Sequence, residues 1–186
     1  MIIAERTTVR PVLTSDRLIL RPLTPTDASD AYVRWLNDAE VNRYSEYRFT
    51  THTLASVRDY IERACADERT HFFAMVTRDG ARHIGNAKLG PIDPHHARAS
   101  FGIMLGERDT WGHGYATEAL ELLEQYAFTT LKLHKLTAGA VAENIGSVRM
   151  LEKRGFAVEG RRREHFRDGR RFLDVIAFGK LRSEHV

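Results

Sequence analysis

The chain has 186 residues, of which 42% are hydrophobic and 28% are charged, and its formal net charge is +3 at pH 7. This size and balance predict one compact domain with a core of its own and leave too little room for two domains. The single cysteine, Cys65, excludes an intramolecular disulfide and every multi-cysteine metal site.

The first half of the chain carries strand and helix signals. We expect residues 1–15 to form an N-terminal arm and residues 16–186 to form a single domain. Apolar spacing predicts, in order, a strand over 16–23, a helix from Thr24, a short second helix within 35–44, a helix over 51–67, and strands over 71–77 and 84–89. Asp79-Gly80 between the last two strands is typical of a hairpin turn.

The second half predicts a further strand, a central helix and a closing pair of strands. Pro91, Asp93 and Pro94 indicate a loop before a strand over 99–105. The remaining signals predict, in order, a helix over 116–127, a strand over 135–141, a short helix over 144–154, and strands over 156–161 and 172–181. Taken together, the elements predict a mixed α/β fold.

A glycine-rich turn lies between the strand over 99–105 and the central helix. Its sequence is Gly112-His113-Gly114-Tyr115-Ala116-Thr117, so few side chains cover the first turn of the helix. The first backbone amides of a helix have no intrahelical partner, and the helix dipole adds partial positive charge there. The turn can therefore hold an anionic group such as a pyrophosphate, although an ordinary glycine-rich connection would have the same composition.

The turn does not match two common phosphate loops. Its third small residue comes one position too early for the dinucleotide fingerprint, and Gly-Lys-Ser/Thr is absent. Instead, it resembles the acetyl-CoA loop of the GCN5-related N-acetyltransferases, Arg/Gln-x-x-Gly-x-Gly/Ala. Trp111 stands at the Arg/Gln position, and Gly114 and Ala116 form the small pair. The form Trp-Gly-x-Gly-Tyr-Ala-Thr-Glu-Ala-Leu is most similar to the ribosomal-protein acetyltransferase branch.

A second motif supports this resemblance. The stretch from Asn144 through Ser147 to Glu152-Lys153-Arg154-Gly155-Phe156 resembles the family's Asn-x-x-Ser…Glu-Lys-x-Gly-Phe pattern. Asn144 is also a good helix cap, and Gly155 is a normal helix stop. The two motifs lie about one helix and one strand apart, as in the family, and the predicted elements follow the family order over nearly the whole chain.

The resemblance implies a fold, an activity and a set of cofactor contacts. The fold would be a central, mostly antiparallel, twisted sheet with a splayed parallel pair, flanked by helices. The activity would be direct transfer of an acetyl group from acetyl-CoA, the co-substrate, to a primary amine. The residues implied in acetyl-CoA binding are Ile103, Met104, Leu105, Trp111, Gly112, His113, Gly114, Tyr115, Ala116, Thr117, Asn144 and Ser147.

The catalytic acid and base do not follow from the resemblance. One branch of the family has a glutamate five positions before the motif asparagine and a tyrosine seven positions after it, but here these positions hold Gly139 and Leu151. Neither side chain can transfer a proton. Glu143 is our candidate base, acting through water, although a solvated glutamate at a helix start is the structural alternative. We expect substrate positioning to supply most of the rate.

By the same resemblance, the acceptor site is expected to be covered by the helical region between the first and second strands. Candidate acceptor-binding residues there are Trp35, Glu46, Tyr47 and Arg48. Glu46 could attract an ammonium group and Arg48 a phosphate or carboxylate, whereas Trp35 and the tyrosines have core packing as the alternative. The preferred acceptor is a protein or peptide N-terminal α-amine. The alternatives are a small amine, such as an amino sugar nucleotide or an antibiotic, and a noncatalytic CoA- or RNA-binding regulator.

Other partners receive less support from the sequence. The run Arg161-Arg162-Arg163 lacks an accompanying aromatic stacking pattern, so a solvated hairpin is favoured over a nucleic-acid contact. The histidines are scattered and lack zinc-binding spacing, so no metal is expected. No apolar run approaches the length of a membrane span, and we expect a cytoplasmic protein. A homodimer is kept as a hypothesis for the assembly.

Overall fold

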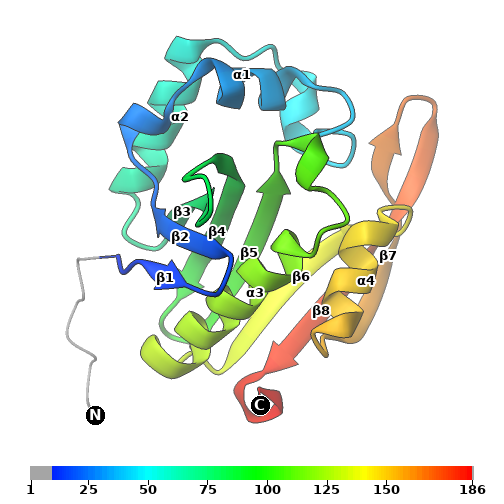
Figure 1. Ribbon diagram of the computed structural model, residues 1–186. Coiled ribbons are helices and arrows are strands. Elements are labelled where there is room, and N and C mark those ends of the chain that lie inside the picture. Colours follow the sequence, from blue (N-terminus) through cyan, green and yellow to red (C-terminus); the bar gives the residue numbers. More distant parts are fainter. Residues whose placement is uncertain (1–9, 186) are drawn as a thin grey trace.

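The computed structural model describes residues 10–185, whose centre is one eight-stranded sheet (Figure 1). The strand order is β1-β2-β3-β4-β5-β6-β8-β7. All neighbouring pairs are antiparallel except β5 and β6, which are parallel. The strands are β1 (Leu13–Thr14), β2 (Leu18–Pro22), β3 (His71–Thr77), β4 (His83–Asp93), β5 (Arg98–Leu105), β6 (Lys135–Val141), β7 (Ala157–Asp168) and β8 (Arg171–Leu181). This architecture confirms the predicted mixed α/β fold with a mostly antiparallel sheet.

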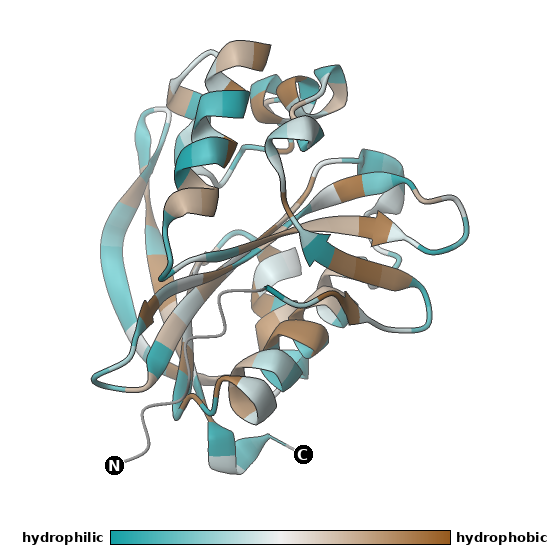
Figure 2. Cartoon of the chain, turned by 90° about the vertical axis from the view of Figure 1, so that its left-hand side faces the viewer, coloured by the Kyte–Doolittle hydropathy of each residue, from teal (hydrophilic) through white to brown (hydrophobic). Residues whose placement is uncertain are grey.

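Helices pack on both faces of the sheet. On one face lie α1 (Asp30–Asn37) and α2 (Leu54–Ala66), and on the other lie α3 (Tyr115–Gln125) and α4 (Ile145–Lys153). Single turns complete the chain: η1 (Pro25–Asp27), η2 (Glu46–Phe49), η3 (Arg108–Thr110), a π-helical turn η4 (Tyr126–Thr130) and η5 (Arg182–Glu184). In Figure 2, hydrophobic colour is frequent on the enclosed strands, whereas the helices carry both colours.

The alternation of side chains along the strands builds two cores. In β3, Phe73 and Met75 pack with α3 and α4, while Phe72 and Ala74 pack with α1 and α2. Because both faces are covered, every residue of β3 is buried. An uninterrupted apolar run in the sequence is what such a strand requires.

The parallel pair β5 and β6 separates soon after it begins. Only residues 98–100 of β5 pair with residues 135–137 of β6. Beyond this point β5 continues to Leu105, and β6 continues to Val141 paired only with β8. Backbone groups of residues 101–105 that face β6 therefore have no strand partner, and apart from the Leu105 carbonyl, which accepts from Trp111 Nε1, they are available to a ligand. The helices α3 and α4 follow the carboxyl ends of these two strands, so both begin at the open end of the split.

Several parts of the chain differ from the sequence expectations: β7 runs on to Asp168, and the helix expected from Thr24 is divided into η1 and α1. Strand β4 continues to Asp93, beyond the expected end at residue 89. Its pairing with β5 shifts register between Leu89 and Ile92, and Pro91 lies in this interval, where its missing backbone N–H disturbs the hydrogen-bond ladder least. The short helix expected within residues 35–44 is absent, because Asp38 Oδ1 accepts a hydrogen bond from the Glu40 amide at 2.8 Å and forms a turn instead. Within the expected N-terminal arm, residues 13–14 form β1 and pair with β2.

His71, at the start of β3, provides a pH-dependent test of this core. Burial lowers the pKa of His71 to about 4, and its Nδ1 lies 2.9 Å from the Tyr126 hydroxyl. Between pH 6.5 and 4 the unfolded chain binds a proton at this site and the folded chain does not, so acidification favours unfolding. We expect the loss to reach about 2 kcal/mol at pH 5.

Urea denaturation at pH 7 and pH 5 measures this effect. His71→Gln retains a polar partner for Tyr126 but cannot titrate, so its unfolding free energy should fall less than that of the wild type between the two pH values. An identical pH dependence in both proteins would show that His71 contributes nothing to it.

Candidate active site

The glycine turn has the backbone geometry that an anion site requires. Gly112 and Gly114 have φ angles of +78° and +85°, which residues with a side chain rarely adopt. A Cβ atom at Gly112 would meet nothing within 4 Å, so the space above the turn is open. The Glu118 amide donates to the Gly114 carbonyl at 3.0 Å, and the helix amides before it lack intrahelical acceptors. The start of α3 can therefore bind an anionic group.

The strand leading into this turn is fixed by contacts to Glu107. Its carboxylate accepts hydrogen bonds from Trp35 Nε1 at 2.8 Å and from Arg82 at 2.7 Å. Burial alone would raise the pKa of Glu107, but these hydrogen bonds outweigh it and the pKa lies below its usual value. Arg82 also pairs with Asp109, so the loop between β5 and α3 is tied to the residue that precedes β4. Sequence spacing gave no indication of this network.

Trp35 packs in the core, which was the alternative considered for it, and its part in acceptor binding stays a prediction. Its side chain is 2% exposed, and its indole packs directly against Gly106. A Cβ atom at Gly106 would lie 2.0 Å from Trp35 Cδ2, so no larger residue fits there. The ring is therefore part of the support below the glycine turn.

Trp111 lies at the surface beside the end of β5. Its side chain is 38% exposed, and Nε1 donates to the Leu105 carbonyl at 3.0 Å. Met104, Leu105 and Ile103 are partly buried along the free edge of the strand. Ile103 and Leu105 pack toward the core on the α3 side and Met104 toward the core on the α1 side, so these side chains alternate between the two faces of the sheet.

The second motif lies at the start of α4. Asn144 Oδ1 accepts a hydrogen bond from the Ser147 amide at 3.3 Å, and this caps the helix as expected. Glu143 precedes the cap, and its exposed carboxylate pairs with the Arg171 guanidinium at 3.1 Å. The hydroxyl of Tyr44 donates to the Glu143 carbonyl at 3.2 Å. The candidate base is therefore held by a cation from β8, a contact that the sequence analysis did not anticipate.

The remaining acceptor candidates come from η2 and differ in their availability. Glu46 is exposed, whereas the Tyr47 hydroxyl lies 2.6 Å from that of Tyr60. Arg48 lies over the Phe166 ring at 4.0 Å and donates to the carbonyls of Arg43 and Arg167. Its guanidinium therefore joins the segment after α1 to the β7–β8 hairpin.

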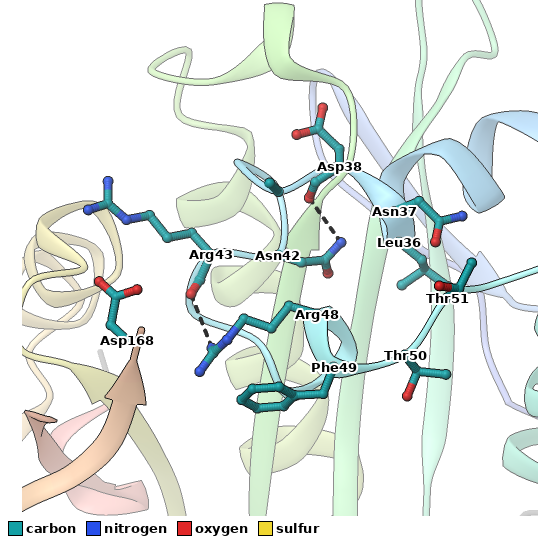
Figure 3. A pocket seen from close by; sticks show the side chains of 11 residues that line it. Leu36, Asn37, Asp38, Asn42, Arg43, Arg48, Phe49, Thr50, Thr51 and Asp168 are labelled. Carbon is teal, nitrogen blue, oxygen red and sulfur yellow. Dashed lines mark hydrogen bonds between the residues drawn. The ribbon is translucent and has the colours of Figure 1, made fainter. Parts of the chain in front are cut away.

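A groove of about 480 Å³ lies between this segment and the tip of the β7–β8 hairpin (Figure 3). Its charged lining residues are Asp38, Arg43, Arg48 and Asp168, and Asn37 and Asn42 add amide groups. Figure 3 shows Asp168 facing Arg43 and Arg48 across the groove. The lining thus offers both carboxylates and guanidinium groups to a polar ligand.

The arginines of the β7–β8 hairpin have partly local partners. Arg161 pairs with Asp174, and Arg171 pairs with Asp168 as well as Glu143.

Among residues 10–185, no three histidine, cysteine or acidic residues come together as a metal site. None of the helices in this described part has the length and apolar character needed to cross a membrane.

Comparison with known proteins gives a consistent result. Residues 17–157 match the family model described as the acetyltransferase (GNAT) domain. An uncharacterized N-acetyltransferase, p20, of Bacillus licheniformis is 31% identical over 94% of this chain and 98% of its own length. Spermidine N(1)-acetyltransferase of Escherichia coli is 34% identical over 76% of this chain and 73% of its own length.

Solved structures share the fold. Spermidine N-acetyltransferase from Vibrio cholerae, in complex with CoA and spermine, superposes with a TM-score of 0.81 and 25% identity, covering 91% of this chain and 98% of that one. An acetyltransferase of the GNAT family from Bacillus anthracis gives a TM-score of 0.79 at 22% identity, over 94% of this chain and all of that one. These relatives do not confirm the ribosomal-protein branch that the glycine turn favoured.

Proposed function

The chain belongs to the acetyltransferase (GNAT) domain family and is an acyltransferase, and from this premise we propose that it transfers an acetyl group from acetyl-CoA directly to a primary amine. The observation that carries the proposal is the split between β5 and β6, with the glycine turn at its open end. A long ligand can pair with the free strand edge while its phosphates meet the start of α3.

In the proposed complex, the pantetheine arm follows the backbone of Ile103–Leu105, and the amides of Gly112–Thr117 hold the pyrophosphate. Asn144 and Ser147 form the opposite side of the split. This arrangement is supported by the unpaired edge of β5 and by the common position of the two helix starts. The Vibrio cholerae relative, which was solved with CoA, supports the choice of cofactor.

The transfer needs a neutral amine beside the thioester carbonyl. The amine nitrogen forms a bond to the carbonyl carbon, the carbon–sulfur bond breaks, the amine gives up a proton, and the CoA thiolate takes one. Holding the two reactants in line supplies much of the acceleration without a covalent intermediate. Cys65 fits no role as a nucleophile, because burial raises the pKa of its thiol and Sγ contacts the Leu23 carbonyl at 3.1 Å.

Glu143 receives a limited role in this mechanism. Its carboxylate is paired with Arg171 and exposed to water, so it can accept a proton through a water molecule but is poorly placed as a strong base. We expect Glu143→Gln to lower kcat by less than about 10-fold, which is below the roughly 100-fold or greater effect of removing a true general base. Steady-state kinetics with Glu152→Gln, an exposed residue further along α4, as the control measures this. A loss of several hundred-fold would instead make Glu143 the main base.

For the acceptor, we propose a small cationic amine that enters near the groove beside Asp38 and Asp168. Carboxylates favour ammonium groups, and both of these already face a cation, Arg108 at Asp38 and Arg171 at Asp168. The spermidine acetyltransferases to which the chain is similar support this class. The phosphorylated small molecule considered from the sequence has less support, because Arg48 is already engaged with backbone carbonyls and Phe166.

A peptide N-terminal α-amine is the second candidate. The observation that favours it is Arg43, whose exposed guanidinium forms no ion pair within residues 10–185 and lines the groove. This cation would repel a polyamine and could instead contact the carbonyl oxygens of a peptide.

Thiol release distinguishes these acceptors. Purified protein and acetyl-CoA are incubated with spermidine, a peptide with a free N-terminus, the same peptide with a blocked N-terminus, and an amino sugar phosphate. Turnover with spermidine alone supports the cationic amine, and turnover with the free but not the blocked peptide supports the second candidate. Absence of acetylated product with every amine would contradict the proposed transfer.

A further inference from the structure

The glycine turn contains no lysine or arginine of its own. Residues 111–117 carry only aromatic, imidazole, hydroxyl and small side chains. An anionic ligand at this place would gain from a fixed cation as well as from backbone amides. The structure supplies one from a distant part of the sequence, Arg17, which immediately precedes β2.

Arg17 contacts both the glycine turn and the Glu118 side chain beyond it. Its Nη1 donates to the His113 carbonyl at 3.0 Å, and its Nε donates to Glu118 Oε2 at 2.9 Å. The guanidinium carbon lies 4.8 Å from the centre of the Tyr115 ring. Nη2 would lie 3.5 Å from a Cβ atom placed on Gly114. A single side chain thus touches the turn and the first turn of α3.

The hydrogen bond to His113 controls the direction of a backbone amide. A peptide group is planar and trans, so its carbonyl and its N–H point to opposite sides. By holding the His113 carbonyl, Arg17 also fixes the direction of the Gly114 amide. Gly114 has a φ of +85°, and a Cβ atom at the neighbouring Gly112 would meet nothing within 4 Å. An outside contact is therefore needed to select one orientation of the peptide group between His113 and Gly114.

Arg17 also compensates an unfavourable charge. Glu118 lies in the first turn of α3, where its carboxylate would repel an anion bound at the same helix start. Burial acts to raise the pKa of Glu118, but hydrogen bonds from Ser15 and Arg17 outweigh it and lower the pKa, so the carboxylate is charged. The Arg17 side chain pairs with this carboxylate and remains 50% exposed.

We propose that Arg17 is a positioning residue for the phosphate groups of the cofactor, because it orients the glycine turn and neutralises Glu118. The inference rests on the proposed function, in which this turn holds the pyrophosphate of acetyl-CoA. It assigns to the segment before β2 a role in cofactor selection, favouring acetyl-CoA over a thioester that lacks phosphates.

The test compares Arg17→Gln with Arg78→Gln. Arg78 is a matched control, because it is also exposed and donates to the Ser15 carbonyl at 2.9 Å without contacting the glycine turn. Michaelis constants are measured with acetyl-CoA and with acetyl-pantetheine, which has the thioester but no phosphate. We expect Arg17→Gln to raise KM for acetyl-CoA by about 10-fold or more while leaving KM for acetyl-pantetheine and the limiting kcat within about 2-fold. Arg78→Gln should leave all of these values within about 2-fold.

Two outcomes would overturn the assignment. One is an unchanged KM for acetyl-CoA in Arg17→Gln, and the other is an equal increase with both thioesters, which would indicate general damage to the site. If Arg17→Gln folds poorly, the double variant Arg17→Gln/Glu118→Gln removes the unpaired carboxylate and should recover part of the acetyl-CoA affinity. A wild-type protein that binds no acetyl-CoA would refute the proposed function itself, before the role of Arg17 arises.

Discussion

Replacing Gly114 by glutamate is expected to raise the dissociation constant for acetyl-CoA by at least about 100-fold. The residue has a φ of +85°, at which a side chain costs roughly 1–2 kcal/mol of strain. The new carboxylate would also stand at the start of α3, where the proposed site holds a pyrophosphate. A pair of like charges about 4 Å apart near a protein surface repel by about 4 kcal/mol. Calorimetric titration of the folded variant measures the loss.

Gly160→Glu is the matched control for this substitution. Gly160 lies in β7 without a positive φ, and a Cβ atom there would meet nothing within 4 Å. The same change in charge and size at this position should leave the acetyl-CoA affinity within about 2-fold of the wild type. Equal affinities of the Gly114 and Gly160 variants would show that the cofactor phosphates bind elsewhere.

Replacing Glu124 by alanine is expected to lower the free energy of unfolding by about 3–5 kcal/mol, the cost of breaking a buried ion pair. Glu124 in α3 is fully buried and accepts hydrogen bonds from Lys180 Nζ at 2.7 Å and from Arg154 at 3.1 Å. Lys180 is itself only 5% exposed, so the substitution leaves a buried ammonium group without its carboxylate. Urea denaturation at pH 7 measures the change.

The neighbouring Glu121 supplies the control. It lies one turn earlier in α3 and also pairs with Arg154, at 3.3 Å, but its side chain is 59% exposed. Because water screens exposed pairs, Glu121→Ala should cost less than about 1 kcal/mol. A similar loss of stability in the two variants would contradict the view that burial of the Glu124 network, rather than pairing with Arg154, decides its contribution.

The sequence predicted best the strands with strong apolar spacing, including β6, in which Gly139 is exposed. The bounds of β3, His71–Thr77, and of β6, Lys135–Val141, are the ones expected from apolar spacing. The cap of α4 by Asn144 was also predictable, because both partners lie within one turn. In these cases local periodicity and tertiary packing favour the same conformation.

The supports of the candidate site could not be predicted in this way. Arg17 and Glu118 are separated by 101 residues, and Tyr44 contacts Glu143 across 99 residues. Such pairs leave no periodic signal, since exposed arginine, glutamate and tyrosine are common on any surface. The contact of Arg48 with Phe166 of the β7–β8 hairpin likewise depends on how distant elements meet. Only the arrangement in space shows which polar residues support the glycine turn.

The central claim is that the open end of the β5–β6 split is an acetyl-CoA site. Calorimetric titration of the wild-type protein with acetyl-CoA tests it most directly. We predict binding of about one equivalent with a dissociation constant in the micromolar range, as is common for enzyme substrates. Absence of measurable binding to a folded protein at millimolar acetyl-CoA would contradict the account.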